Sequence, residues 1–580
     1  MLGHPIAAIH DPRRALAPGV ARARVEAMAG SSVREIGALT VAAACAGDKT
    51  LPSAWKASWP AALSGLRGLR GAFALIAWDA ETGRALVARD HLGARPLFYA
   101  SVGATLYVAS EIAPLLGLLP RRPEPDRDEL ARRLVRGTGV HGQTLFTGVR
   151  EIPAAHALLL DEQGSKLERY WRPQPYAGLA EADEAAASAA LRAGVAAAVD
   201  RHSRGRGATG VLASGGLDSS AVLACAVASA RAGGRATPAG WLGIPEQPEL
   251  DESPFLHDVA AHCGAESVRI PVPSGPIVPR AIAYLDRWAV PLEHPGGAFF
   301  LPVHEAAAAR GVTALLDGEG GDELFGCEPL LIGDRLRSGD LAGAARLIRE
   351  LPGMSAISAR SLAVVARKWV APALLPPFAL NAVRRIRATR RPTPEWLRAA
   401  ALEVSREPEN DTWPGKPRWR AHLGWVLTDG RDAFGVHDQL RRVASMAGVE
   451  DLHPFLDVDL IELVLGLPPQ LAFDTSLDRK LLREAMRGLL PESVRLRRDK
   501  VYFGPLLRDA LTGRDHAAVD RILTSSTLEL GDLVNQDALS AMWRGGPERC
   551  ARGPLAWAAE SWRAFVLELW LRREAGRSEE

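Results

Sequence analysis

Ser214-Gly215-Gly216-Leu217-Asp218-Ser219-Ser220 decides the fold of this 580-residue chain. The stretch follows an apolar run at 211–213 and precedes an Ala-rich run at 221–232 that contains neither Gly nor Pro. The first run predicts the end of a buried strand, and the second predicts a helix. A Gly-rich turn at a helix N-terminus attracts anions, because unpaired N–H groups and the positive end of the helix dipole lie there. We therefore expect a phosphate loop, with an ordinary serine-capped turn as the alternative.

The residue types in this loop predict a nucleotide bound together with magnesium. Gly215 and Gly216 let the backbone approach an anion closely, and the three serine hydroxyls add donors. Asp218 would repel a phosphate unless Mg²⁺ lay between them, since Mg²⁺ takes oxygen ligands from one or two carboxylates and from phosphates. Neither a Gly-x-x-x-x-Gly-Lys-Ser/Thr nor a Gly-x-Ser-x-Gly pattern occurs, which disfavours a γ-phosphate-transferring P-loop enzyme and a serine hydrolase.

The loop resembles the pyrophosphate loop of the N-type ATP pyrophosphatases, which cleave ATP between the α and β phosphates to make acyl-adenylates. This resemblance implies ATP and Mg²⁺ as cofactors, with Asp218 as a magnesium ligand. We expect Leu212, at the end of the preceding strand, to contact the nucleotide. Leu242, beside Trp241, is placed like the family segment that lines the adenine. Core packing is an equally good interpretation of Trp241.

Composition limits the classes of function that remain. The chain has 70 basic and 68 acidic residues, so it carries no general attraction to nucleic acid or to membranes. Its five cysteines form no C-x-x-C pair, which argues against a disulfide framework and against a zinc site. No apolar run approaches the roughly 20 residues that span a bilayer. We expect a cytoplasmic protein of two or more domains, with no nucleic-acid or membrane partner.

Four short segments in the first half predict strands separated by turns: 73–78, 85–88, 96–100 and 105–109. Their order, with Ala88-Arg89-Asp90-His91-Leu92-Gly93-Ala94-Arg95-Pro96-Leu97-Phe98-Tyr99 in the middle, is similar to the class II glutaminase domain of asparagine synthetases. The resemblance implies an Ntn-type αββα domain, which we place at residues 1–172.

The nucleophile of that glutaminase family is a cysteine at the mature N-terminus, with the free amine nearby as base. Here the chain begins Met1-Leu2-Gly3, and Cys45 is the only cysteine before Cys225. We therefore expect a degenerate domain without glutaminase activity, which serves as a scaffold or holds a partner.

Strand-like and helix-like segments alternate beyond the proposed boundary, which predicts a parallel α/β sheet. We expect strands at 238–244, 267–272 and 312–316 and a helix at 252–262, followed by a helical part after Leu341. Together with the pyrophosphate loop, this pattern predicts a Rossmann-like ATP pyrophosphatase domain over residues 173–580.

The strand at 312–316 leads into Asp317-Gly318-Glu319-Gly320-Gly321-Asp322-Glu323-Leu324-Phe325-Gly326. This turn resembles the Ser-Gly-Glu-Gly-x-Asp-Glu-x-Phe-Gly motif of asparagine synthetases, with Asp317 in place of the serine. The resemblance implies that Asp322 is the second magnesium ligand, that Asp317 and Gly318 lie against the nucleotide, and that Glu319 faces the acyl carbon. A solvated turn with helix-capping carboxylates is the alternative.

A third segment resembles the C-terminal signature of the same synthetases: Gly448-Val449-Glu450-Asp451-Leu452-His453-Pro454-Phe455-Leu456-Asp457, then Arg479 to Ala485, then Arg497-Arg498-Asp499-Lys500. The resemblance implies that Lys500 steadies the charge that develops during attack on the acyl-adenylate. A solvated basic run is the alternative. Leu452 stands where the family pattern carries an arginine, which removes a charge that a small amino-acid substrate would need.

These resemblances imply a carbon–nitrogen ligase in which a carboxylate attacks ATP and an amine then attacks the acyl-adenylate. A synthetase without a glutaminase nucleophile needs free ammonia or an amine on its own substrate. The second option resembles the lasso peptide cyclases, which join a precursor peptide's N-terminal amine to an Asp or Glu side chain as a macrolactam. A leader-binding protein and a leader peptidase are possible partners in that case.

Three alternatives stay open. One is an ammonia-dependent asparagine synthetase-like ligase. Another is a β-lactam synthetase-like cyclase, although those enzymes carry a tyrosine where this chain has Glu319. The third is a catalytically silent scaffold, against which the acidic residues and Lys500 argue.

Overall fold

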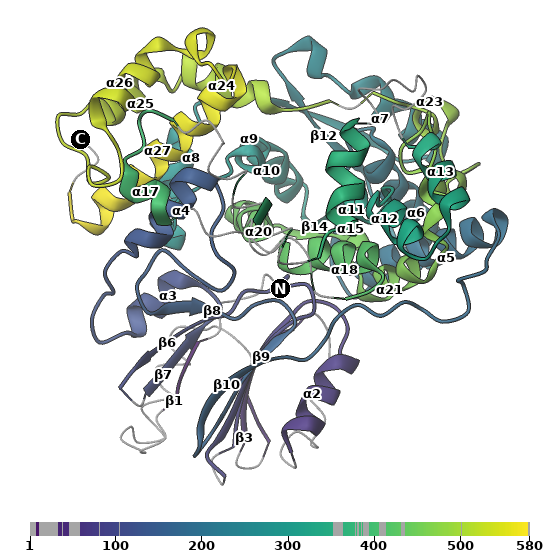
Figure 1. Cartoon of the computed structure of the whole chain (residues 1–580), viewed down its shortest axis with the longest axis horizontal. Helices are drawn as coiled ribbons and strands as arrows, with labels where there is room; N and C mark the ends of the chain where they lie inside the picture. Colours follow the sequence, from purple (N-terminus) through teal and green to yellow (C-terminus); the bar gives the residue numbers. More distant parts are fainter. Residues whose placement is uncertain are drawn as a thin grey trace.

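The computed structural model describes residues 7–10, 33–36, 39–45, 58–79, 82–103, 105–351, 363–376, 394–404, 415–430, 435–499 and 501–577, with isolated positions between 379 and 413. Its first part is a β sandwich, and its second part is a larger α/β body with a helical C-terminal region (Figure 1). This arrangement confirms the predicted fold class. Lys500 lies outside the described residues.

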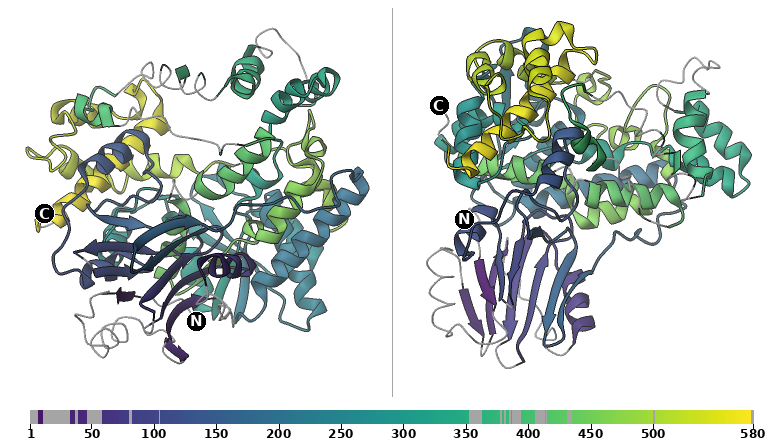
Figure 2. Two further views of the ribbon diagram at one scale, coloured as in Figure 1. Left: turned by 60° about the horizontal axis from the view of Figure 1, so that its bottom comes forward. Right: turned by 60° about the vertical axis from the view of Figure 1, so that its left-hand side comes forward.

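Two antiparallel sheets form the sandwich, and Figure 2 shows them face to face. The first has the order β1 (Ala7–His10), β7 (Thr105–Ala109), β6 (Phe98–Val102) and β8 (Val149–Glu151). The second has the order β10 (Gly164–Arg169), β9 (His156–Asp161), β5 (Arg84–Arg89), β4 (Phe73–Asp79), β3 (Leu39–Cys45) and β2 (Val33–Ile36).

Alternation along β4 explains why helices cover the sandwich. Phe73 and Leu75 belong to the apolar cluster beneath α2 (Trp59–Gly68), whereas Ala74 and Ile76 belong to the cluster between the two sheets. Successive side chains of a strand point to opposite faces, so both faces of β4 are buried. On the other side, α3 (Ile112–Leu118) packs against β6 and β7. The layers are those of an Ntn-type αββα domain, as predicted.

The second half is built on a five-stranded parallel sheet in the order β13 (Ser267–Val272), β12 (Gly240–Pro245), β11 (Ala208–Leu212), β14 (Val312–Leu316) and β15 (Glu450–Leu452). The first four strands lie where the sequence predicts them. The fifth corrects the expectation that everything after Leu341 is helical. β15 has three residues, two of them acidic, so periodicity cannot reveal it, and only pairing with β14 makes it a strand.

Helices flank this sheet, and the long C-terminal helix packs against the first half of the chain. No helix or strand forms over residues 172–183, and α5 then begins at Glu184. Within α27 (Pro554–Glu574), Trp557, Trp562 and Trp570 are almost completely buried. Trp570 meets the ring of Phe146, from the first half, edge to face at 5.3 Å between centroids. The two halves therefore share one apolar cluster, and the yellow helices lie against α4 in Figure 1.

In the first half, α4 (Arg127–Arg136) follows α3. The other long helices around the parallel sheet and in the C-terminal part are α5 (Glu184–Ser203), α6 (Leu217–Ala232), α7 (Ser253–Cys263), α8 (Val278–Trp288), α10 (Leu301–Ala309), α12 (Leu330–Arg337), α13 (Leu341–Arg349), α18 (Arg418–Trp425), α20 (Val436–Met446), α21 (Val458–Gly466), α24 (Gly504–Thr512), α25 (His516–Leu523) and α26 (Gln536–Gly545). The short helices are α9 (Gly296–Phe299), α11 (Gly321–Phe325), α15 (Ala371–Leu374), α17 (Ala399–Val404), α22 (Lys480–Ala485) and α23 (Glu492–Arg495).

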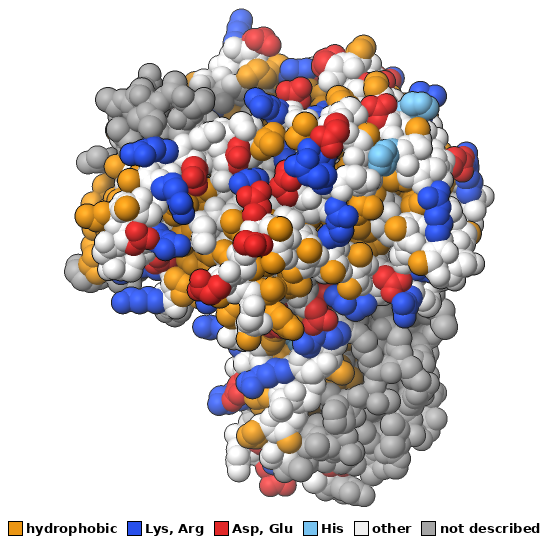
Figure 3. Space-filling model, turned by 90° about the vertical axis from the view of Figure 1, so that its right-hand side faces the viewer, with side chains coloured by type: hydrophobic (Ala, Val, Ile, Leu, Met, Phe, Trp, Pro, Cys, Tyr) orange, Lys and Arg blue, Asp and Glu red, His pale blue; other side chains and the backbone are white. Residues whose placement is uncertain are grey.

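Basic and acidic side chains are interspersed on the face of the molecule in Figure 3, which agrees with the balanced composition. Over the part of the chain that the structure describes, no helix is long and apolar enough to cross a membrane.

Candidate active site

The loop between β11 and α6 has the geometry of an anion-binding turn. Gly215 has φ +76°, a left-handed conformation that favours glycine. A Cβ at Gly215 would lie 2.5 Å from the Phe255 Cβ, so the backbone passes close to α7. Ser214 N–H donates to the Ser219 hydroxyl at 3.1 Å, which closes the loop. Side-chain size and backbone conformation therefore both require glycine at position 215.

Helix α6 begins four residues earlier than the sequence predicts. Gly216 is the N-cap, and Leu217 to Ser220 already form the first turn. The prediction from Ala221 was wrong because polar residues in a first turn do not reveal a helix by apolar periodicity. The earlier start places Asp218 in the first helical turn, at the positive end of the dipole. The Ser220 hydroxyl is buried, with no partner among the described residues.

The acidic turn after β14 lies directly against this helix start. β11 and β14 are adjacent parallel strands, so their carboxyl ends meet at one edge of the sheet. A Cβ at Gly318 would lie 2.6 Å from the backbone nitrogen of Ser219, and one at Gly321 would lie 2.7 Å from the Asp218 Cγ. Only glycine at these positions allows such a close approach. The structure thus brings the two predicted nucleotide-binding segments together.

Asp218 and Asp322 converge on the guanidinium of Arg479. Arg479 Nη1 contacts the Asp218 Oδ2 and lies 3.0 Å from the Asp322 Oδ1. Burial lowers the pKa of Arg479, but Asp218 and the neighbouring Asp478 outweigh this effect and raise it overall. The sequence did not single out Arg479 for this role, although it belongs to the third signature segment. The two predicted magnesium ligands are therefore within reach of one cation.

This pair of carboxylates fits magnesium held jointly by protein and phosphate. No group of three or more His, Cys, Asp or Glu side chains within the described ranges could hold a metal ion by itself. Mg²⁺ in nucleotide sites commonly takes one or two carboxylates and completes its shell with phosphate oxygens and waters. Asp218 and Asp322 would hold it, and the assignment as ligands stays a prediction.

Asp317 forms an ion pair with His453, which follows β15. His453 Nδ1 lies 2.9 Å from the Asp317 Oδ1, and the same carboxylate oxygen accepts from the Glu319 N–H at 3.0 Å. Burial lowers the pKa of His453, but the charge of Asp317, with its hydrogen bond, overcomes this and raises the pKa to about 9. Asp317 therefore faces an imidazolium at neutral pH, and it fixes the backbone at Glu319.

The third segment also reaches the phosphate loop. Arg497 pairs with Glu252 at 2.7 Å, and both side chains are almost fully buried. Its guanidinium lies 3.8 Å from the ring centroid of Phe255, and Nη1 donates to the Gly215 carbonyl at 3.4 Å. Lys500 follows three residues later in the sequence. The role of Lys500 stays a prediction, because the residue is outside the described ranges.

The two leucines expected at the nucleotide lie on neighbouring strands. Leu212 pairs in register with Trp241, and Leu242 follows on β12. Leu242 and Trp241 are 5% and 2% exposed and belong to apolar clusters, whereas Leu212 is partly buried. Their contribution to nucleotide binding stays a prediction. For Trp241, the structure agrees with the core-packing alternative.

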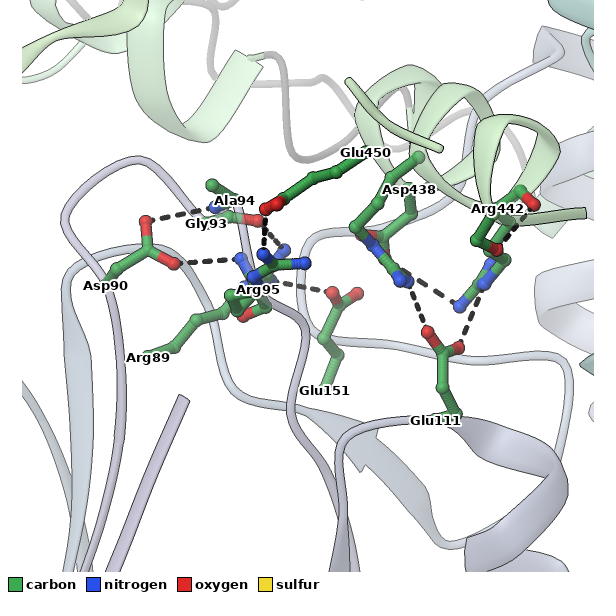
Figure 4. A network of polar contacts seen from close by, with 12 residues as sticks. Arg89, Asp90, Gly93, Ala94, Arg95, Glu111, Glu151, Asp438, Arg442 and Glu450 are labelled. Carbon is green, nitrogen blue, oxygen red and sulfur yellow. Dashed lines mark hydrogen bonds and ion pairs between the residues drawn. The ribbon is translucent and has the colours of Figure 1, made fainter. Parts of the chain in front are cut away.

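Ion pairs tie the edge of this site to the sandwich, as Figure 4 shows. Arg95, from the first half, and Arg206 both contact the carboxylate of Glu450 on β15. Glu111 contacts Arg441 and lies 3.0 Å from Arg442 Nε on α20. β15 is therefore held from both sides, by β14 and by the first half of the chain.

Comparison with known proteins identifies the family. Residues 190–572 match the family model described as asparagine synthase. The chain belongs to the asparagine synthase family. Residues 58–171 match the model of a glutamine amidotransferase domain. As a member of this family, the protein is an ATP-dependent amide ligase that resembles the asparagine synthetases.

Two curated relatives of this asparagine synthase family chain have identities of 24%. Asparagine synthetase [glutamine-hydrolyzing] 3 of Bacillus subtilis matches over 450 residues, 75% of this chain and 67% of that protein. Amidase chyE of Penicillium rubens matches over 524 residues, 82% of this chain and 75% of that protein. A solved structure of glutamine phosphoribosylpyrophosphate amidotransferase from B. subtilis covers 40% of this chain and 44% of that chain, at 18% identity and a TM-score of 0.16.

Proposed function

We propose that this asparagine synthase family protein is a peptide cyclase of the lasso type. It adenylates an Asp or Glu side chain of a precursor peptide and joins it to the peptide's N-terminal amine as a macrolactam, with release of AMP and pyrophosphate. The observation that carries the adenylation step is the convergence of the phosphate loop and the acidic turn on one point, through Asp218 and Asp322. A leader-binding protein and a leader peptidase would supply the processed substrate.

In the first step, a carboxylate oxygen of the peptide attacks the α-phosphorus of ATP, and the bond to the bridging oxygen of pyrophosphate breaks. Backbone N–H groups at the start of α6 and the hydroxyls of the loop receive the phosphates. Asp218 and Asp322 would hold Mg²⁺, which draws off the charge that builds up on the leaving pyrophosphate. Arg479, beside both carboxylates, offers a further cation at the same point.

In the second step, the peptide amine attacks the acyl carbon, the carbon–nitrogen bond forms, and AMP leaves. Glu319 accepts the proton that the amine loses, and its backbone is fixed by the hydrogen bond to Asp317. Lys500 would stabilise the negative charge on the tetrahedral intermediate. No covalent bond between enzyme and substrate is needed.

Leu452 favours a peptide over a free amino acid as the substrate. Its side chain is 6% exposed and belongs to the apolar cluster on one side of the parallel sheet. It therefore offers no charge to the α-carboxylate of a free aspartate. A residue within a peptide has no such carboxylate, so the loss of the family arginine costs a peptide cyclase little.

The test mixes the purified protein with ATP, Mg²⁺ and a leader-free candidate peptide that carries an Asp or Glu near its N-terminus. Mass spectrometry should find a peptide that has lost one water, together with equimolar AMP and pyrophosphate. Asp218→Ala and Asp322→Ala should abolish both. Asparagine formed from aspartate and ammonia, with no cyclic peptide, would refute the cyclase.

A second candidate is an asparagine synthetase-like ligase that uses ammonia. It is favoured by the glutamine amidotransferase domain match and by the relative from Bacillus subtilis, whose name includes glutamine hydrolysis. Amide formation from free ammonia by the purified protein, with no cyclic peptide, would select this function. Glutamine-dependent amide formation would in addition refute our prediction that the first domain has no glutaminase activity.

A further inference from the structure

His453 stands at the same sheet edge as the nucleotide-binding loops. β14 and β15 pair in parallel with Leu316 opposite Leu452, so Asp317 and His453 are the next residues after each strand. The Asp317 N–H donates to the Leu452 carbonyl at 3.0 Å, which continues the pairing past the strand ends. Ligands of an open parallel sheet bind outside the carboxyl ends of its strands. His453 is therefore placed where the substrate of this site must arrive.

Among the described residues, hydrogen-bond partners engage one ring nitrogen of His453, Nδ1. Nδ1 lies 2.9 and 3.0 Å from the two oxygens of Asp317, and these contacts set the orientation of the ring. Within the described ranges, Nε2 has no hydrogen-bond partner, and this nitrogen is not fully buried. The side chain keeps 12% of its surface exposed. A second N–H donor, held in a fixed direction, thus remains available to a ligand.

The surroundings of His453 keep the ring charged. Among the described residues, charged and titratable groups that face the ring are Asp317 and Glu319 of the acidic turn, Asp451 of β15, His437 of α20 and His202 of α5. Burial lowers the pKa of His453, and the three carboxylates raise it to about 9 overall. The ring is therefore an imidazolium at neutral pH, and it loses this charge only as the pH rises through about 9.

We propose that His453, oriented by Asp317, is the residue that binds the carboxylate to be adenylated. This inference rests on the proposed function and names the group that recognises its acid substrate. A carboxylate is the anion that such a site must accept before ATP reacts, and a charge-assisted hydrogen bond from Nε2 is the direct way to hold it. Leu452 is apolar and buried, and the adjacent His453 supplies a cation where β15 ends. After adenylation the same N–H donates to the acyl oxygen.

The experiment measures binding rather than turnover, so that it does not depend on knowing the peptide. The probes are N-acetyl-aspartyl amide and its neutral isostere, N-acetyl-asparaginyl amide, observed by saturation-transfer NMR with the full-length protein. Wild type should bind the aspartyl probe, and not the asparaginyl probe, at about pH 7. His453→Asn should weaken aspartyl binding about tenfold, because an amide can donate but carries no charge. Binding to wild type should also fall as the pH is raised through about 9.

Two controls separate binding from folding. His156→Asn changes a partly buried histidine of the first half, whose Nδ1 lies 2.8 Å from the Ala154 carbonyl oxygen, and should leave aspartyl binding unchanged. Retained saturation transfer to the adenine protons of ATP shows that the nucleotide site of each variant is folded. Equal aspartyl binding by His453→Asn and wild type, or equal binding of both probes to wild type, would overturn the inference. His453-dependent binding without acid-dependent ATP–pyrophosphate exchange would instead refute the proposed function.

Discussion

Gly318→Ala tests directly whether the contact between the acidic turn and the phosphate loop is essential. The new Cβ would lie 2.6 Å from the Ser219 nitrogen and 2.9 Å from the Asp218 carbonyl carbon, and these atoms are backbone at a helix start. They cannot rotate away as a side chain would. To reach an ordinary contact of about 3.4 Å the two segments must separate by about 0.8 Å. Displacements of about 1 Å in a reacting site cost about 10²-fold in rate.

We therefore expect Gly318→Ala to lower acid-dependent ATP–pyrophosphate exchange by about 10²-fold. Overpacking should lower the free energy of unfolding by about 1–3 kcal/mol, measured by urea denaturation. The matched control is Gly296→Ala in α9, where a Cβ would meet nothing within 4 Å. Exchange at the wild-type rate in a folded Gly318→Ala variant would show that the contact does not set the geometry of the site.

Further predictions concern the two predicted magnesium ligands and the contact between the two halves. Asp218→Asn and Asp322→Asn should each lower pyrophosphate exchange by about 10²-fold or more, because amides replace the charged ligands; wild-type exchange in both would contradict the assignment. Glu111→Gln should lower the free energy of unfolding by about 3 kcal/mol, since it removes the closest carboxylate from the buried Arg442 and the partly buried Arg441. Glu124→Gln, in an exposed pair, should cost less than about 1 kcal/mol, and equal losses in urea denaturation would refute this reasoning. Burial raises the pKa of Glu111, but the charges of Arg441 and Arg442 outweigh this and lower the pKa overall. The ionised Glu111 therefore stabilises the fold at neutral pH, and this stabilisation should be lost as the pH falls below about 4.3. Urea denaturation between pH 7 and pH 3 should show this loss in wild type and not in Glu111→Gln.

Much of the fold could be predicted because its signals are local. The strand, loop and helix around Gly215 follow one another directly, and the predicted strands of the parallel sheet show apolar runs bounded by turns. The start of α6 and the existence of β15 could not be predicted in the same way. The first is hidden by polar residues that belong to the site, and the second is a three-residue strand defined only by its neighbour.

The sequence by itself determined which residue types the site contains: a glycine-rich loop, two carboxylates that we predict to hold magnesium, and the acid at Glu319. These are properties of residue types and spacings within short segments. Only the tertiary structure decided that Arg479 lies between Asp218 and Asp322 and that His453 pairs with Asp317. These partners are more than 130 residues apart along the chain, and the order of strands in the sheet, which no local pattern encodes, brings them together.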